Sequence, residues 1–168
     1  SRVGPEERDA VNASTFGTGE ILRAVLDAGI RRIDLGVGGS ATTDGGLGIL
    51  AALGLTMTVE PELAVHLHDL DPRLAEVDLR IASDVTNPLL GPTGAAAVYG
   101  PQKGASPVDV TNLDAALGRC HAVIDDGLGE RAPGVRRQFA SFLMLLRILP
   151  VARFGSTFES LGADRQRR

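Results

Sequence analysis

A glycine-rich segment, residues 36–46 (GVGGSATTDGG), lies between a strand-like run and a helix-like run. Ile33, Leu35 and Val37 alternate before it as the inward side chains of a strand would, and residues 47–54 (LGILAALG) follow as a small apolar helix. Dense glycine usually indicates positive φ or close approach of backbone to a ligand. Strand, glycine loop and helix in this order predict an α/β fold with a parallel sheet.

The flanking segments extend this α/β pattern. A helix is predicted over 19–28, with Thr18 as its N-cap and Gly29 as its C-cap. Further strands are expected at 56–59 and 78–83, and a long helix at 107–125. The apolar stripe of that helix contains Val110, Leu113, Leu117, Cys120 and Ile124. Cys120 is therefore expected to be a packed thiol.

Composition limits the possible partners. The chain is 43% apolar, enough for a core, and its net charge of -4 argues against a nucleic-acid coat. No apolar stretch reaches the length of a membrane span, and the polar N-terminus does not resemble a secretory signal. The single cysteine cannot form an internal disulfide. We therefore expect a cytoplasmic protein with no membrane or nucleic-acid partner.

The glycine loop is a candidate anion site. Backbone N–H groups around Gly38 and Gly39 can cradle an anion in front of a helix N-terminus. Hydroxyl groups and a carboxylate follow in the order Ser40, Thr42, Thr43 and Asp44. Asp44 could hold Mg²⁺ or accept a substrate proton. The segment is not a Walker A loop, because the Gly-Lys pair followed by Ser or Thr is missing.

Two later segments add candidates. Asp84 begins residues 84–89 (DVTNPL) at the expected carboxyl end of a strand, where α/β proteins bind ligands. Asp84 could coordinate a metal or orient a substrate hydroxyl. Asn87 could bind a carboxylate or phosphate, or cap the turn before Pro88. Lys103 is the only lysine in the chain and lies in residues 100–105 (GPQKGA), where a compact cation suits phosphate; the adjacent Gln102 is a further binding candidate.

Other interpretations remain open at this point. Gly36, Gly38 and Ala41 fit the G-x-G-x-x-G/A fingerprint of NAD(P)-binding Rossmann-type oxidoreductases. That fingerprint alone is a weak signal. It would also place Gly45 and Gly46 inside the first turns of the helix that packs on the sheet, where glycine lowers helix stability. A non-catalytic anion-binding module is a second alternative. His66 and His68 could suggest a metal, but no third ligand is evident, so an ordinary surface segment is expected.

Four blocks together resemble the bacterial-type glycerate kinase family over residues 2–134. They are residues 17–20 (GTGE), 38–46 (GGSATTDGG), 84–91 (DVTNPLLG) and 100–105 (GPQKGA). The resemblance implies part of a two-domain α/β fold with a cleft, and transfer of the γ-phosphate of ATP to D-glycerate with Mg²⁺. It marks loop 38–43 as a phosphate or carboxylate cradle, Asp44 and Asp84 as metal ligand or base, and Lys103 as the balancing charge.

The resemblance also implies that the chain is incomplete. Members of the family are roughly twice as long, and their N-terminal phosphate-contacting segment is absent here. We expect residues 1–134 to be a partial domain that is inactive alone, with an exposed apolar face that favours self-association. Residues 135–168 form a divergent basic and aromatic tail, and we expect a frameshifted or unstructured segment there. Its phenylalanines are Phe139, Phe142, Phe154 and Phe158.

Overall fold

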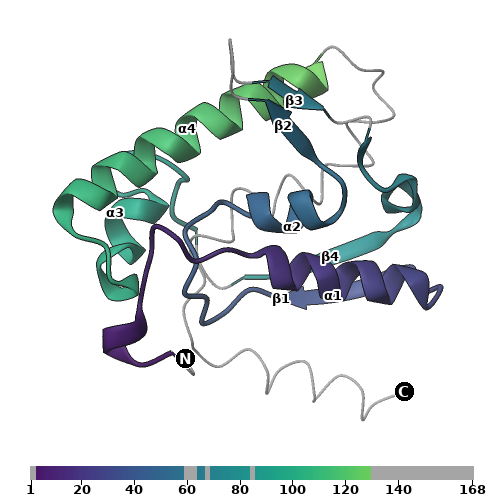
Figure 1. Cartoon of the computed structure of the whole chain (residues 1–168), viewed down its shortest axis with the longest axis horizontal. Helices are drawn as coiled ribbons and strands as arrows, with labels where there is room; N and C mark the ends of the chain where they lie inside the picture. The colour runs from purple at the N-terminus through teal and green to yellow at the C-terminus, as the bar shows by residue number, and fades with distance from the viewer. Residues whose placement is uncertain (1–2, 59–63, 67–68, 84–85, 130–168) are drawn as a thin grey trace.

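The computed structural model describes residues 3–58, 64–66, 69–83 and 86–129 of the chain (Figure 1). The tail predicted at 135–168 lies outside these residues. The helices are η1 (Pro5–Glu7), α1 (Phe16–Asp27), α2 (Leu47–Ala52), η3 (Pro72–Glu76), α3 (Ala95–Tyr99), η4 (Pro101–Lys103) and α4 (Pro107–Gly129), and the strands are β1 (Arg32–Gly36), β2 (Thr56–Thr58), β3 (Ala64–His66) and β4 (Asp78–Ala82). No helix in the described ranges is long and apolar enough to cross a membrane.

The predicted parallel sheet is present as the pair β1 and β4. Ile33 lies opposite Leu79 and Leu35 lies opposite Ile81, so the apolar side chains of both strands share one face. That face packs on the core. Parallel strands need a crossover between them, and here α2 and η3 lie in the intervening sequence. The α/β expectation is confirmed.

The strand expected at 56–59 differs from the prediction in its pairing. It forms as β2 but pairs antiparallel with β3, with Met57 opposite Val65, and it does not join the parallel sheet. The two short strands are close together in the sequence, which favours local antiparallel pairing. The expectation that this strand belongs to the parallel sheet is therefore wrong.

The main core lies between the sheet and the helices. Figure 1 shows α4 running past α3 at one end and past β2 and β3 at the other, with α2 between α4 and α1. Leu22 and Leu26 of α1, Ile49 and Leu50 of α2, and Leu79 of β4 are buried in one cluster. Ile124 of α4 joins this cluster, as its predicted stripe required.

Helix α1 begins three residues before the predicted start, at Phe16, and its N-cap is Thr15 in place of the expected Thr18. The carbonyl of Thr15 accepts hydrogen bonds from Thr18 N–H and Gly19 N–H, so Thr18 already lies in the first turn. Gly29 follows the end of the helix with φ of 81°, as the C-cap prediction implied.

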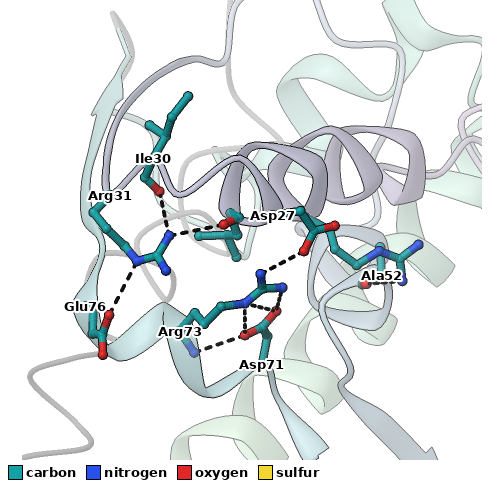
Figure 2. Close-up of polar contacts among 9 residues, drawn as sticks. Asp27, Ile30, Arg31, Ala52, Asp71, Arg73 and Glu76 are labelled. Atoms are coloured by element: carbon teal, nitrogen blue, oxygen red, sulfur yellow. Dashed lines mark hydrogen bonds and ion pairs between the residues drawn. The ribbon is translucent and has the colours of Figure 1, made fainter.

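A charged cluster fixes η3 against the C-terminal end of α1 (Figure 2). Arg73 contacts the Asp71 carboxylate at 2.6 Å and the Asp27 carboxylate at 2.7 Å. Hydrogen bonds from Arg73 hold the pKa of Asp71 below its ordinary value. Arg31 lies beside this cluster and donates to Glu76 at 3.4 Å and to the carbonyl of Leu26 at 3.2 Å.

The second face of the parallel sheet is exposed and charged. Arg32 and Arg80 lie 3.6 Å and 3.5 Å from the Asp78 carboxylate, and Asp34 also lies on this face. Parallel sheets usually have both faces covered. Among the described residues, the exposed face of this sheet is therefore polar. The expectation of an exposed apolar face where the missing part would pack stays a prediction. Self-association was not tested and stays a prediction.

Candidate functional site

The glycine loop follows β1 and ends at α2, and its glycines adopt the conformation that their number predicted. Gly39, Gly45 and Gly46 have φ of 71°, 62° and 83°. Gly46 is the N-cap of α2, which begins at Leu47. Gly45 and Gly46 therefore precede the helix, and its start agrees with the apolar helix predicted at 47–54. Their positive φ lets the chain turn sharply into α2.

Asp44 joins the N-terminal ends of two helices. Its Oδ2 accepts hydrogen bonds from the backbone N–H and the hydroxyl of Thr15, both at 2.8 Å, and from Gly48 N–H at 3.1 Å. Its Oδ1 accepts from Gly46 N–H at 3.1 Å. The hydroxyl of Thr15 in turn accepts from Ile49 N–H at 3.0 Å. One carboxylate thus satisfies backbone donors of both α1 and α2, which otherwise have no partner at a helix start.

Two glycines let these helices approach closely. A Cβ on Gly19 would lie 2.6 Å from the Cβ of Ala52 and 2.7 Å from the carbonyl oxygen of Ile49. Gly48 faces Phe16 and Ser14 at a similarly close approach. The GTGE block and the glycine after Leu47 therefore have a packing role, because only glycine fits at these two contacts.

Lys103 is buried against the loop. Only 3% of its surface is exposed, and its Nζ donates to Ser40 Oγ at 3.1 Å and to the carbonyl of Thr42. Burial lowers the pKa of Lys103 to about 8, while the negative charge of Asp44 acts in the opposite direction. Gly104 has φ of 94° and packs against Arg8, whose guanidinium donates to the carbonyl of Gln102 at 2.9 Å. These contacts hold η4 in place beside the loop.

A pocket of about 240 Å³ opens beyond the carboxyl end of β1. Its walls are the loop on one side and the start of α1 on the other. The lining residues are Ser14, Thr15, Thr18, Leu35, Gly36, Val37, Gly38, Ser40, Ala41 and Thr42. Sequence reasoning predicted the loop side of this pocket. It missed Ser14 and Thr15 and treated Thr18 only as a helix cap, although Thr18 belongs to the GTGE block that supports the family resemblance.

The remaining predicted residues lie at different places. Thr43 is buried and its hydroxyl has no hydrogen-bond partner among the described residues. The Asn87 side chain accepts from the Tyr99 hydroxyl at 2.9 Å and donates to the Thr93 carbonyl at 3.1 Å. These contacts lie beyond the turn before Pro88, so neither of its two expected roles is decided by them. The side chain of Gln102 is exposed. Asp84 lies outside the described residues, so its predicted role stays a prediction.

No group of three or more His, Cys, Asp or Glu side chains in the described ranges could hold a metal ion. His66 contacts the Thr58 hydroxyl at 3.4 Å on the small antiparallel sheet, and His68 lies outside the described residues. Cys120 is half-buried, and burial raises the pKa of its thiol, which fits a packed and unreactive side chain.

Comparison with known proteins gives one consistent result. The model of the glycerate kinase family matches residues 1–137. A glycerate kinase of Haemophilus influenzae is 43% identical over 142 residues, which is 77% of this chain and 38% of the relative. The glycerate 2-kinase of Escherichia coli is 38% identical over 139 residues, or 75% of this chain and 36% of the relative.

A solved structure gives the same result for the fold. A crystal structure assigned to glycerate kinase 2 of Salmonella typhimurium LT2 superposes with a TM-score of 0.70 at 42% identity. The match covers 73% of this chain and 37% of the other. The chain thus spans little more than a third of the length of the relatives it matches.

Proposed function

The chain belongs to the glycerate kinase family, and we propose that it forms part of an enzyme that transfers the γ-phosphoryl group of ATP to a hydroxyl of D-glycerate. Such an enzyme is a phosphotransferase with an alcohol group as acceptor. Family membership favours this function over the nicotinamide-dependent alternative. The activity is proposed for the whole protein, because the chain spans only 38% of a relative such as the Haemophilus influenzae glycerate kinase.

One observation carries the proposal: the single lysine of the chain is buried against the glycine loop, where its Nζ contacts Ser40 and Thr42. Phosphoryl transfer depends on positioning and on neutralisation of negative charge. A buried cation beside the backbone N–H groups of a glycine loop supplies both. A solvent-exposed lysine would supply much less, because water screens its charge.

The proposed roles follow from these positions. The reaction forms a bond between a glycerate oxygen and the γ-phosphorus and breaks the bond to ADP, while the hydroxyl proton passes to a base. Loop residues Gly38 to Thr43 orient the reacting groups, and Lys103 balances the negative charge. ATP supplies the phosphoryl group when bound.

Magnesium is part of the proposal, but the described residues do not by themselves fit a magnesium centre. Asp44 is the acid of the loop, and its two oxygens already accept hydrogen bonds from Thr15, Gly46 and Gly48. A carboxylate has about four acceptor sites, so little capacity remains for a metal. The hydrogen bonds to Asp44 therefore argue against it as a metal ligand or base, whereas Asp84 lies outside the described residues. The metal-ligand and base roles of both residues stay predictions.

Some further expectations stay predictions beside this proposal. They are a cytoplasmic location, the lack of a nucleic-acid partner, self-association, and substrate contacts by Asn87 and Gln102. The Asn87 amide is already tied to Tyr99 and Thr93, so its effect on substrate would act through the position of the loop that carries it.

A chimera tests the proposed function. Residues 1–137 of this chain replace the matched segment of the Haemophilus influenzae glycerate kinase, and ADP release is measured with and without D-glycerate. We expect glycerate-dependent ADP release, and a loss of roughly a hundredfold in kcat/KM on Lys103→Met, the scale seen when a charge-stabilising group is removed. Arg119→Met, at an exposed position of α4, is the control.

Two results would count against the proposal. One is a folded chimera whose ADP release does not depend on glycerate. The other is a Lys103→Met chimera as active as the parent. The chain alone is expected to give no turnover, and robust turnover by it would contradict the expectation that a larger protein is needed.

A further inference from the structure

The pocket at the end of β1 presents hydroxyl groups from two walls that lie far apart in the sequence. Thr18 comes from the first turn of α1, and Thr42 from the glycine loop. Within the described part of the chain, neither hydroxyl has a hydrogen-bond partner. Thr15, by contrast, donates to Asp44 and accepts from Ile49, so its hydroxyl is already used. Two lining hydroxyl groups, one from each segment, thus remain available to a ligand.

The charges around the pocket suit a ligand with one negative charge. None of its lining residues has an ionisable side chain. A cation contacts two of the lining residues: Lys103 donates to Ser40 Oγ and to the Thr42 carbonyl. The Asp44 carboxylate is covered by donors from Thr15, Gly46 and Gly48 and does not line the pocket.

The size of the pocket also selects among the possible ligands. Pockets for drug-sized ligands measure about 300–1,000 Å³. A volume of about 240 Å³ therefore fits a three-carbon acid better than a nucleoside triphosphate. A triphosphate also carries several negative charges, and their neutralisation needs more cations than the one lysine that contacts the loop residues of this pocket.

We propose that this pocket binds the hydroxy acid and not the phosphates of the nucleotide, and that Thr18 and Thr42 are its recognition residues. The Thr18 hydroxyl, the Thr42 hydroxyl and the N–H groups of the loop bind the carboxylate and hydroxyls of the acid. Lys103 balances its single charge through the loop wall. The identity of the acid as D-glycerate rests on the proposed function, whereas the location and the two threonines rest on the pocket.

Binding to the whole chain tests this without turnover. D-glycerate is titrated into residues 1–168 without nucleotide by calorimetry, and the variants Thr18→Val and Thr42→Val remove one hydroxyl each with little change in shape. Each is expected to weaken the Kd roughly tenfold or more, since a hydrogen bond to a charged group is lost. Thr111→Val, at an exposed position of α4, is the matched control and leaves the Kd unchanged. Thermal melting checks that all variants fold.

Two further probes separate the pocket from a phosphate site. Inorganic phosphate and ATP are titrated into the same variants, and we expect their affinities to be insensitive to Thr18→Val and Thr42→Val. Unchanged D-glycerate affinity in both variants, lack of D-glycerate binding by the parent chain, or a larger effect on phosphate than on D-glycerate would each overturn the inference.

The chimera separates this inference from the proposed function. Hydroxyl-dependent binding of D-glycerate without turnover in the chimera would support the pocket and count against the kinase function. Turnover in the chimera with an unchanged KM for D-glycerate in both threonine variants would support the kinase function and overturn the pocket assignment.

Discussion

The Asp44 carboxylate accepts hydrogen bonds from both the backbone N–H and the hydroxyl of Thr15, each at 2.8 Å, across 29 positions of sequence. Gly46 and Gly48 donate to the same carboxylate from the start of α2. Asp44 is therefore a shared cap for two helices that form the base of the candidate site. A residue type expected for catalysis is here a structural link between α1 and α2.

Replacement of Asp44 by Ala should strongly lower stability. It leaves buried backbone donors without partners, each of which costs about 1–3 kcal/mol. We expect the free energy of unfolding, measured by urea denaturation, to fall by at least about 2 kcal/mol. Asp34→Ala, on the exposed face of the sheet, should stay within about 0.5 kcal/mol. A loss of Mg²⁺-dependent activity in the chimera without a loss of stability would instead support the metal-ligand role of Asp44.

Gly17 and Gly19 of α1 should respond in opposite directions to Ala. A Cβ on Gly19 would meet Ala52 at 2.6 Å, whereas nothing lies within 4 Å of a Cβ on Gly17. Gly19→Ala should therefore cost more than about 1 kcal/mol through overpacking. Gly17→Ala should add roughly 0.5–1 kcal/mol, because Ala is the better helix former. Equal effects of the two substitutions on the urea midpoint would contradict the close contact of α1 and α2.

Thr43→Val should not destabilise the protein. The Thr43 hydroxyl is buried without a partner in the described structure, and valine has nearly the same shape. A buried hydroxyl that lacks a hydrogen bond costs about 1–3 kcal/mol, so the free energy of unfolding should stay equal or rise. A clear decrease would show that the hydroxyl has a partner. Thr15→Val, which removes a hydroxyl that donates to Asp44 and accepts from Ile49, is the contrasting variant and should destabilise.

Lys103 should make stability rise with pH in alkaline solution. Its pKa is about 8 in the folded chain against 10.5 for the ordinary group. Between these values the unfolded chain binds more protons than the folded one, so the free energy of unfolding increases with pH. Cys120, whose pKa burial raises, contributes with the opposite sign. The difference between the parent and Lys103→Met across this window is therefore the measured quantity, and a flat difference would contradict the buried, desolvated lysine.

Local patterns predicted the elements that rely on local periodicity. The alternation of Ile33, Leu35 and Val37 indicated β1, and the stripe ending at Ile124 indicated α4, because each pattern lies within one element. The pairing of β2 was missed because register depends on the partner strand, which periodicity within residues 56–59 does not contain.

The sequence predicted which residue types gather near the glycine loop, but it did not predict which side chains contact one another. Lys103 was singled out because it is the only lysine, and the structure brings its Nζ to Ser40 across 63 positions. The sequence offered no signal for the partnership of Asp44 with Thr15, since a single carboxylate after a glycine loop has the same pattern whether it binds a metal or caps a helix. Thr18 was assigned to a cap position because helix starts are uncertain by a few residues.

The charged face of the β1–β4 sheet, which is exposed among the described residues, determines which kind of layer can rest on it. Arg32, Asp78 and Arg80 already form a chain of alternating sign across the two strands. A covering layer must therefore bring compensating charges or keep water at the contact, since an apolar layer would bury these charged side chains without compensation for their lost hydration. Attachment through such a face weakens as ionic strength rises. Salt concentration is thus a practical means of loosening whatever covers this side of the sheet without melting the core beneath it.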